Sequence, residues 1–514
     1  MATDASETED SEAAPDAYRT LLEEYRRVAN LQAASGVLSW DQQVMMPEAG
    51  TPARSQQLST LSGLSHELLT DDGVGEALAE LDAAGLTPEQ SASVREIRRK
   101  HDRATAVPKS LIEEMSIAAS EALPAWEAAK ADDDFEAFAP HLRRHVELSR
   151  EYAEQIDPDR DPYAVLFEEF EPCLSLERAE SILTTLRETL VPMIEAVRES
   201  DVDLATDAFT SLGEYPADTQ EELCRDVLSA LGYPWERGRL DTAPHPFSSG
   251  TTFDARVTTR FDESDPLGSL LSTVHEFGHA TYTLGLADDH YGTPLGEDRD
   301  LSVHESQSRL WENHVGRSQA FWEGFLPTVA EHFPQAADVT PRAAYEAANQ
   351  VYEDNLIRVE ADELTYHLHV VIRYEIERDL IRGDLDVTEV PEVWNDKYEE
   401  YLGIRPDSDT EGCLQDIHWA HGNFGYFPTY SLGSAMAAQL YAAAADDIEG
   451  LESSVAAGKF EPLHEWLTEH VHRHGARYET DDLVEHATGS TFTADAFVDY
   501  VTEKYGTLYD LDSV

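Results

Sequence analysis

The chain has 514 residues and carries 102 acidic against 37 basic residues, which gives a formal net charge of −65. Its hydrophobic content of 41% is enough for a large core, so the charge does not indicate disorder. The sequence has no basic stripe that could neutralise phosphates, which excludes nucleic-acid binding. It contains no run of about 18 apolar residues, so we expect no membrane-spanning segment.

The acidic residues are spread along the whole chain rather than gathered in one tail. In molar salt the Debye length falls to about 3 Å, and repulsion among exposed carboxylates is largely screened. This distribution favours adaptation to a salty cytoplasm over a patch for a basic partner.

The first part of the chain is predicted to be helical. Residues 1–15 are acidic and polar and lack the features of a secretory signal, so we expect a frayed tail on a cytoplasmic protein. Over 16–240, apolar residues recur at three- and four-residue steps, as at Tyr18, Leu21 and Tyr25. This spacing is typical of amphipathic helices.

The pattern changes over residues 243–261, where Pro, Gly and Ser give way to alternating Thr, Phe and Val. Alternation of this kind predicts a short strand or hairpin. Asp265 and Pro266 then form the start of a new helix, because an acidic cap residue is followed by a proline suited to the first helical position.

The remaining chain shows further helical spacing, interrupted by one loop. The helical segments are 302–330, 341–383 and 388–402, and the loop covers 405–434. We find no internal repeat and no linker. The sequence therefore predicts a single mainly α unit over 1–514, in which 241–514 form the catalytic region.

The segment TVHEFGHATY contains an H-E-x-x-H motif formed by His275, Glu276 and His279. Residues four apart share one face of a helix, so both histidines can direct a ring nitrogen at one ion. Glu276 lies one step round, where it can contact a water on that ion. A hydrolytic zinc site needs a third protein ligand, and Glu305 on the next expected helix is the candidate. These residues predict a metal-dependent peptidase.

The motif by itself leaves a structural alternative open. A bare H-E-x-x-H is also compatible with an ordinary helix whose histidines cover the edge of a core. A second cluster, His470, His472 and His474, has ligand-like spacing but no adjacent catalytic carboxylate. We interpret it as a solvated, histidine-rich helix end.

Six motifs, in the same order, make the sequence similar to the carboxypeptidase Taq family of metallocarboxypeptidases over nearly its whole length. Besides H-E-x-x-H they are H-P-F at 245–247, D-x-R-x-T at 254–258, H-E-S-Q at 304–307, I-R-x-x-A-D at 357–362 and G-x-x-Q-D-x-H-W at 412–419. The resemblance implies a mainly α fold with a deep active-site groove, N-terminal helices over the groove and one small β-sheet beside the metal site. It also implies one Zn²⁺ or Co²⁺ ion per chain, a homodimer, and removal of C-terminal residues from peptides with broad specificity.

Groups beside the metal are expected to complete the chemistry. Glu276 would take a proton from the attacking water and deliver it to the leaving amine. The developing oxyanion needs a fixed donor, for which the candidates are His245, Tyr426 and Tyr430. Each tyrosine could equally be a packed aromatic residue.

An exopeptidase must also bind a free carboxylate, which an arginine does best through paired hydrogen bonds. By the resemblance, Arg358 is the first candidate. The other candidate substrate contacts are Gln415, His418, Arg256 and His304. For Arg256 the favoured alternative is a structural pair with Asp254.

Two other functions remain open from the sequence. An oligoendopeptidase or peptidyl-dipeptidase on a similar helical scaffold would not need an arginine that closes the groove one residue beyond the cleaved bond. An inactive helical binding protein would keep the fold without depending on Glu276.

Overall fold

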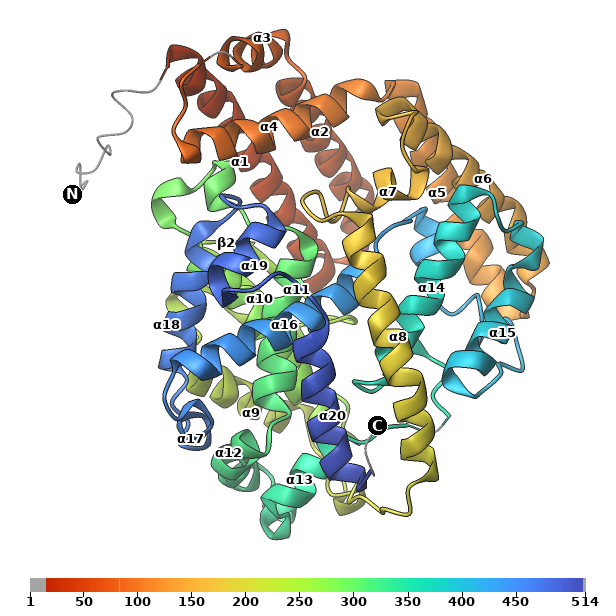
Figure 1. The fold of residues 1–514 in the computed structure, drawn as a ribbon, viewed down its shortest axis with the longest axis vertical. Helices are drawn as coiled ribbons and strands as arrows, with labels where there is room; N and C mark the ends of the chain where they lie inside the picture. The colour runs from red at the N-terminus through yellow and green to blue at the C-terminus, as the bar shows by residue number, and fades with distance from the viewer. Residues whose placement is uncertain (1–14, 83, 353, 512–514) are drawn as a thin grey trace.

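The computed structural model describes residues 15–511 except residues 83 and 353, so the expected acidic tail lies almost wholly outside the described residues. The described chain is a large helical body with one small sheet, which confirms the predicted fold class (Figure 1). None of its helices is both long and apolar enough to cross a bilayer.

The region predicted to be helical before residue 240 is helical. Its helices are α1 (Asp16–Val44), α2 (Thr51–Leu69), α3 (Asp72–Leu81), α4 (Pro88–Ala106), α5 (Lys109–Asp132), α6 (Phe135–Ile156), α7 (Pro162–Phe167), α8 (Leu176–Glu199) and α9 (Ala217–Leu231). Helices α1 to α4 lie together at one end of the molecule (Figure 1), and α1, α3 and α4 share a small core of their own. Tyr18, Leu21 and Tyr25 of α1 are buried in that core, as their spacing predicts.

Helices from both parts of the chain share the main hydrophobic core. The later helices are α10 (Pro266–Gly285), α11 (Leu301–Arg309), α12 (Gln319–His332), α13 (Pro341–Ala348), α14 (Thr365–Arg382), α15 (Val390–Leu402), α16 (Pro428–Asp447), α17 (Leu451–Ala456), α18 (Glu461–His470), α19 (Thr480–Thr488) and α20 (Asp495–Tyr509). Helix α10 packs on α9, on α11 and on the sheet, so it lies in the interior of the body.

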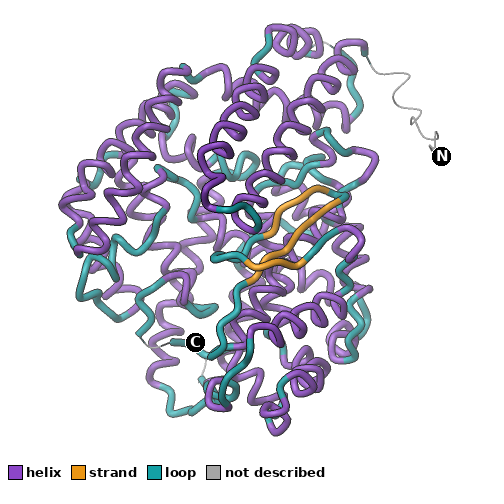
Figure 2. The backbone as a smooth tube through the Cα atoms, turned by 180° about the vertical axis from the view of Figure 1, so that it is seen from behind, coloured by secondary structure: helices purple, strands orange, loops and turns teal. Residues whose placement is uncertain are grey.

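The strand element predicted near residue 250 is a three-stranded sheet with the order β1-β3-β2. Its strands are β1 (Leu240–Thr242), β2 (Ser248–Thr251) and β3 (Asp254–Thr259). Strand β3 is parallel to β1 and antiparallel to β2, with Ser249 opposite Arg256. Figure 2 shows the sheet between the N-terminal helices and the rest of the body. One face of β3 packs on α10, which places the sheet beside the H-E-x-x-H helix.

Helix α10 begins as predicted, because the Asp265 side chain accepts a hydrogen bond from the Leu267 N–H and Pro266 takes the first helical position. The prediction of one helix over 341–383 is wrong, since α13 and α14 are separated by a segment that contains only a short 3₁₀ turn, Arg358–Glu360. There the Asp362 carboxylate accepts the backbone N–H groups of Leu364 and Thr365. A carboxylate that binds these N–H groups favours the start of a new helix over the continuation of an old one.

Two smaller differences concern the ends of predicted segments. Residues 428–434 belong to α16 rather than to a loop, because Pro428 opens the helix. The segment predicted as helix over 302–330 contains a π-helical stretch, Leu310–Gly316, between α11 and α12. Such stretches are rare and occur frequently at functional sites.

Candidate active site

Two histidines of α10 and one glutamate of α11 meet at a single point. Glu305 Oε2 lies 3.4 Å from His279 Nε2 and 3.8 Å from His275 Nε2. The ligand atoms of these three residues all lie within 4.8 Å of one another. Among the described residues, no other group of three His, Cys, Asp or Glu side chains comes as close together.

Close helix packing carries Glu305 to this point. A Cβ on Gly433 of α16 would lie 2.6 Å from the Cβ of Glu305, so α16 presses directly on the stem of this side chain. Arg309 Nε donates to Glu305 Oε1 over 2.7 Å, which leaves Oε2 facing the two histidines. Burial would raise the pKa of Glu305, but the charge of Arg309 outweighs it and the pKa is lowered, so the carboxylate stays ionised.

The outer nitrogen of each histidine has a defined partner. His275 Nδ1 lies 2.9 Å from Glu312 Oε2. An ionised carboxylate can only accept, so Nδ1 carries the proton and the Nε2 lone pair is free. His279 Nδ1 lies 2.6 Å from His304 Nδ1, so one proton is shared between these nitrogens. When His279 donates it, its Nε2 is likewise free.

Glu276 is buried next to these ligands. Its Oε2 atom has no hydrogen-bond partner among the described residues. Burial raises the pKa of Glu276 to about 7. A carboxyl group with such a pKa can both accept and release a proton near neutral pH, as a general base requires.

These donors fit a divalent ion. Two imidazole nitrogens and one ionised carboxylate form the His₂Glu set of hydrolytic zinc sites, which keep one position open for a water or substrate. The Glu312 carboxylate on Nδ1 sets the His275 imidazole in the tautomer whose Nε2 can bind metal.

Arg358 lies in the segment between α13 and α14, and its guanidinium is almost fully paired. Nη2 donates to Asp416 Oδ1 over 2.9 Å, Nε also donates to the Asp416 carboxylate, and Nη1 lies 3.3 Å from the Tyr366 hydroxyl. The same guanidinium lies about 5.5 Å from the ring centres of Phe427 and Tyr430. Asp416 therefore orients Arg358.

Tyr426, Tyr430 and His418 lie with Arg358 in one aromatic cluster. Tyr426 and Tyr430 pack edge to face with ring centres 5.2 Å apart, and His418 stacks on Tyr426 at 5.7 Å. His418 Nδ1 is buried without a hydrogen-bond partner among the described residues and lies 4.0 Å from Asp416 Oδ1. Burial lowers the pKa of His418 to about 4, so its imidazole is neutral.

Gln415 is committed to the fold around this cluster. Its carbonyl accepts hydrogen bonds from the Arg358 backbone N–H and from the Arg373 guanidinium. Its amide group donates to the backbone carbonyls of Leu356 and Glu411. All its polar atoms thus hold the loops that carry Arg358 and Asp416.

Two predicted residues lie in the sheet or in its connections, where no hydrogen bond or ion pair joins them to the three ligands. His245 is exposed in the connection between β1 and β2. Arg256 of β3 pairs with Asp254 at 2.6 Å, and its guanidinium lies 4.4 Å from the ring centre of Trp40 on α1. The structural pair expected as an alternative for Arg256 is therefore present.

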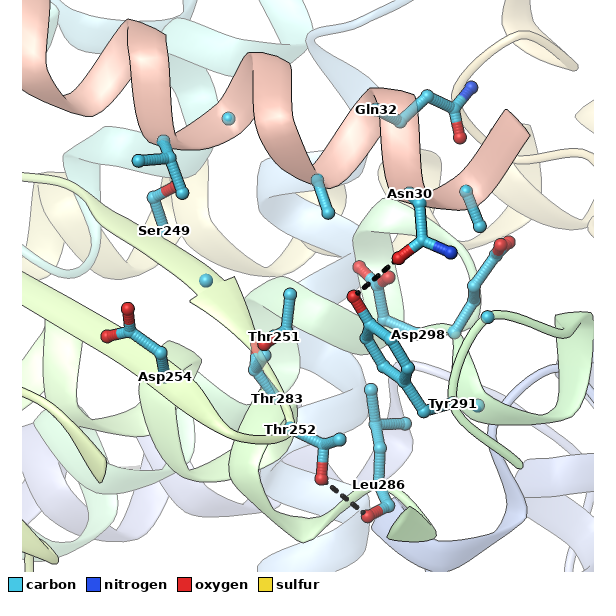
Figure 3. A pocket seen from close by; sticks show the side chains of 18 of the residues that line it. Asn30, Gln32, Ser249, Thr251, Thr252, Asp254, Thr283, Leu286, Tyr291 and Asp298 are labelled. Carbon is cyan, nitrogen blue, oxygen red and sulfur yellow. Dashed lines mark hydrogen bonds between the residues drawn. The ribbon is translucent and has the colours of Figure 1, made fainter. Parts of the chain in front are cut away.

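A pocket of about 690 Å³ is lined by residues of α1, of β2 and of the segment that follows α10 (Figure 3). Asn30 of α1 reaches across it and accepts a hydrogen bond from the Tyr291 hydroxyl over 3.3 Å. His304 and Asp298 line the same pocket, and His304 Nε2 lies 3.6 Å from Asp298 Oδ2. His304 therefore touches both the ligand His279 and the pocket.

The second histidine cluster does not converge. His472 is buried, and its Nε2 lies 3.0 Å from Gln307 Oε1. His470 Nδ1 lies 2.9 Å from the Trp466 carbonyl, and His474 packs on His486. The segment follows the end of α18, as interpreted, but the expectation that it is solvated is wrong for His472, whose side chain packs in the interior against Gln307.

The sequence analysis missed Arg309, Glu312 and Tyr366. Arg309 bonds to Glu305, and its guanidinium lies 4.8 Å from the ring centre of Tyr366, which also contacts Arg358. Tyr366 thus links the metal ligands to the aromatic cluster. The spacing of Glu305, Arg309 and Glu312, four and then three residues apart, was a helical signal that could have drawn attention to them.

A mainly helical fold whose buried H-E-x-x-H histidines meet a glutamate from the next helix defines a metal-dependent hydrolase. The sequence model of the carboxypeptidase Taq (M32) metallopeptidases matches residues 20–505. The chain therefore belongs to the M32 family and is a metallocarboxypeptidase that hydrolyses peptide bonds. The family resemblance is confirmed, and the carboxypeptidase hypothesis is favoured over an oligoendopeptidase or peptidyl-dipeptidase.

Known proteins resemble the chain along almost its whole length. It is 39% identical to "Thermostable carboxypeptidase 1" of Thermus thermophilus, over 96% of this chain and 99% of that protein. It is 35% identical to "Carboxypeptidase 1" of Bacillus subtilis, over 94% and 97%. The crystal structure of the M32 carboxypeptidase from Deinococcus radiodurans R1 superposes with a TM-score of 0.92 at 37% identity, over 96% of this chain and all of that one.

Proposed function

We propose that the enzyme removes C-terminal residues from peptides with a free carboxylate, using one Zn²⁺ or Co²⁺ ion held by His275, His279 and Glu305. The convergence of these three ligand atoms within 4.8 Å carries the proposal. An ion bound there supplies the positive charge that acidifies a water and polarises the scissile carbonyl.

Glu276 acts as the general base and then as the general acid. Its carboxylate takes a proton from the attacking water, and the protonated carboxyl group returns that proton to the nitrogen of the leaving residue. The free Oε2 atom and the pKa of about 7 support this role, because the group is available and changes charge near neutral pH.

Arg358 binds the C-terminal carboxylate of the substrate. Asp416 accepts hydrogen bonds from Nε and Nη2 of the Arg358 guanidinium. The remaining nitrogen, Nη1, would face the substrate beside Tyr366. A charge-assisted bond to an arginine contributes about 1.5–3 kcal/mol. This contribution would distinguish a peptide acid from a peptide amide.

Further contacts surround these central residues. Tyr426 and Tyr430 are the candidate oxyanion donors within the aromatic cluster, and His245 is the candidate on the sheet side. His418 would contact the substrate next to Arg358, whereas Gln415 would act there only by holding the loops that carry Arg358 and Asp416. His304 and Arg256 would contact the part of the peptide that lies in the pocket under α1. The homodimer, the salt-adapted origin and the cytoplasmic location stay predictions.

Cleavage of matched peptides tests the proposal. A free-acid peptide and its C-terminal amide would be incubated with the enzyme after removal of metal and reloading with Zn²⁺ or Co²⁺. We expect sequential loss of C-terminal residues from the acid, little cleavage of the amide, and no activity without metal. Equal cleavage of acid and amide would contradict the exopeptidase assignment.

A further inference from the structure

Glu312 is an internal glutamate that has no role in the reaction proposed above. Glu312 is in the π-helical stretch Leu310–Gly316 that follows α11. Its side chain is 10% exposed, and its Oε2 atom lies 2.9 Å from His275 Nδ1. The contact joins the outer nitrogen of a metal ligand to an internal carboxylate.

Two arginines neutralise this carboxylate from the other side. Arg317 Nη2 lies 2.9 Å from Glu312 Oε1, and Arg309 Nη1 lies 3.3 Å from Glu312 Oε2. These two guanidinium groups supply the opposite charge that a buried carboxylate needs, so Glu312 is held in its ionised form. An ionised carboxylate can only accept the hydrogen bond from His275 Nδ1.

Arg309 bonds to two carboxylates, that of the ligand Glu305 and that of Glu312. It donates to the ligand Glu305 through Nε at 2.7 Å and to Glu312 through Nη1 at 3.3 Å. Glu312 and Arg309 therefore contact two of the proposed ligands, His275 and Glu305 respectively. Glu305, Arg309 and Glu312 lie within seven residues of one another on the helix that runs from α11 into the π-helical stretch, and Arg317 follows directly after that stretch.

We propose that Glu312 is a positioning residue that holds His275 in the tautomer and orientation needed to bind the metal, and that Arg309 and Arg317 keep its charge in place. The inference rests on the proposed ligand set. A carboxylate on the outer nitrogen increases the basicity of an imidazole ligand, and its loss typically weakens metal binding by about 10–100-fold.

The dissociation constant for Zn²⁺ tests this role, measured by competition with a chelating indicator on metal-free protein. We expect Glu312→Ala to raise the Zn²⁺ dissociation constant by roughly 10–100-fold. Glu312→Gln should raise the dissociation constant less, because the amide oxygen can still accept a hydrogen bond from His275 Nδ1 although the negative charge is lost. The visible absorption of the Co²⁺-loaded Glu312→Ala variant should also change, since the His275 ring is no longer held.

Glu375 provides a matched control. It is a buried glutamate, 8% exposed, that pairs with Arg187 at 2.7 Å and Lys397 at 2.5 Å but touches none of the three ligands. Glu375→Ala should lose stability while its Zn²⁺ affinity stays within about twofold of the parent, which separates loss of a buried ion pair from loss of a ligand partner.

Two outcomes distinguish failure of this inference from failure of the ligand set. If Glu312→Gln, which is close in shape to the parent residue, shows the parent Zn²⁺ affinity and Co²⁺ spectrum, the positioning role is overturned. His279→Ala should abolish tight binding in the same assay. If it does not, the proposed ligand set itself is wrong.

Discussion

Gly278 of α10 lies directly against Ser308 of α11: a Cβ on Gly278 would be 2.5 Å from the Cα of Ser308 and 2.5 Å from the carbonyl oxygen of Gln307. Backbone atoms cannot turn aside as a side chain can, so only glycine allows the two helices to approach this closely. Because His275 and His279 lie on either side of Gly278 and Glu305 lies on α11, this approach sets the separation of the metal ligands.

Gly278→Ala should therefore separate α10 from α11. We expect at least a tenfold loss of Zn²⁺ affinity and a decrease of about 1–3 kcal/mol in the free energy of unfolding. Denaturant titration and indicator competition measure the two effects. Gly506→Ala in α20, where an added Cβ meets nothing within 4 Å, is the control and should leave both unchanged or raise stability slightly.

Glu276→Gln should remove proton transfer without removing the metal. We expect kcat to fall by about 10²–10⁴-fold, the usual contribution of a general base, while Zn²⁺ affinity stays near that of the parent. Steady-state kinetics on a free-acid peptide and metal titration measure the two quantities. A variant that retains more than about a tenth of the parent kcat would exclude Glu276 as the base.

Arg358→Ala should reduce discrimination in favour of free C-termini. A lost contribution of about 1.5–3 kcal/mol corresponds to a decrease of roughly 10–150-fold in kcat/KM on peptide acids. Asp416 would still be paired with Arg373, so no unpaired buried charge should destabilise the fold. Arg405→Ala, which removes an exposed arginine that pairs only with surface acids, is the control. An unchanged ratio of acid to amide cleavage in Arg358→Ala would refute the assignment.

Buried histidines should make the fold sensitive to mild acid. Burial lowers the pKa values of His314, His367 and His472 to about 3, against about 6.5 in an unfolded chain. Below pH 6.5 these histidines bind protons in the unfolded state but not in the folded state, so the free energy of unfolding falls as pH decreases. Each histidine contributes up to about 1.4 kcal/mol per pH unit.

Denaturant titrations between pH 7.5 and 5 would measure this slope, above the range in which most carboxylates titrate. His367→Gln removes one of the three groups and should make the slope shallower by the contribution of one proton. An identical slope in the variant would show that His367 is not kept neutral by the fold.

High salt should be needed for the native structure. With a net charge of −65, exposed carboxylates repel one another strongly when the Debye length is long. We expect helical circular dichroism and peptidase activity to fall together as KCl is lowered from molar concentration. Full structure and activity in dilute buffer would contradict the interpretation of the acidic composition as salt adaptation.

The sequence alone was sufficient for the parts of the site that depend on local geometry. His275 and His279 are four residues apart on one helix, so their shared face follows from the helical repeat, and the start of α10 follows from Asp265 and Pro266. The ordered motifs identified the family, which the comparisons confirmed. Glu305 could be proposed because a third ligand was required and the next helix offered a glutamate.

Only the tertiary structure decided which other groups meet these residues. The contact between His275 and Glu312 depends on how closely α10 approaches α11, and the pairing of Arg358 with Asp416 joins two segments 58 residues apart. The break before α14 also went unpredicted, because the Asp362 carboxylate closes a turn that helical periodicity does not reveal. Local spacing encodes which face a side chain occupies, whereas packing of distant segments determines what that face touches.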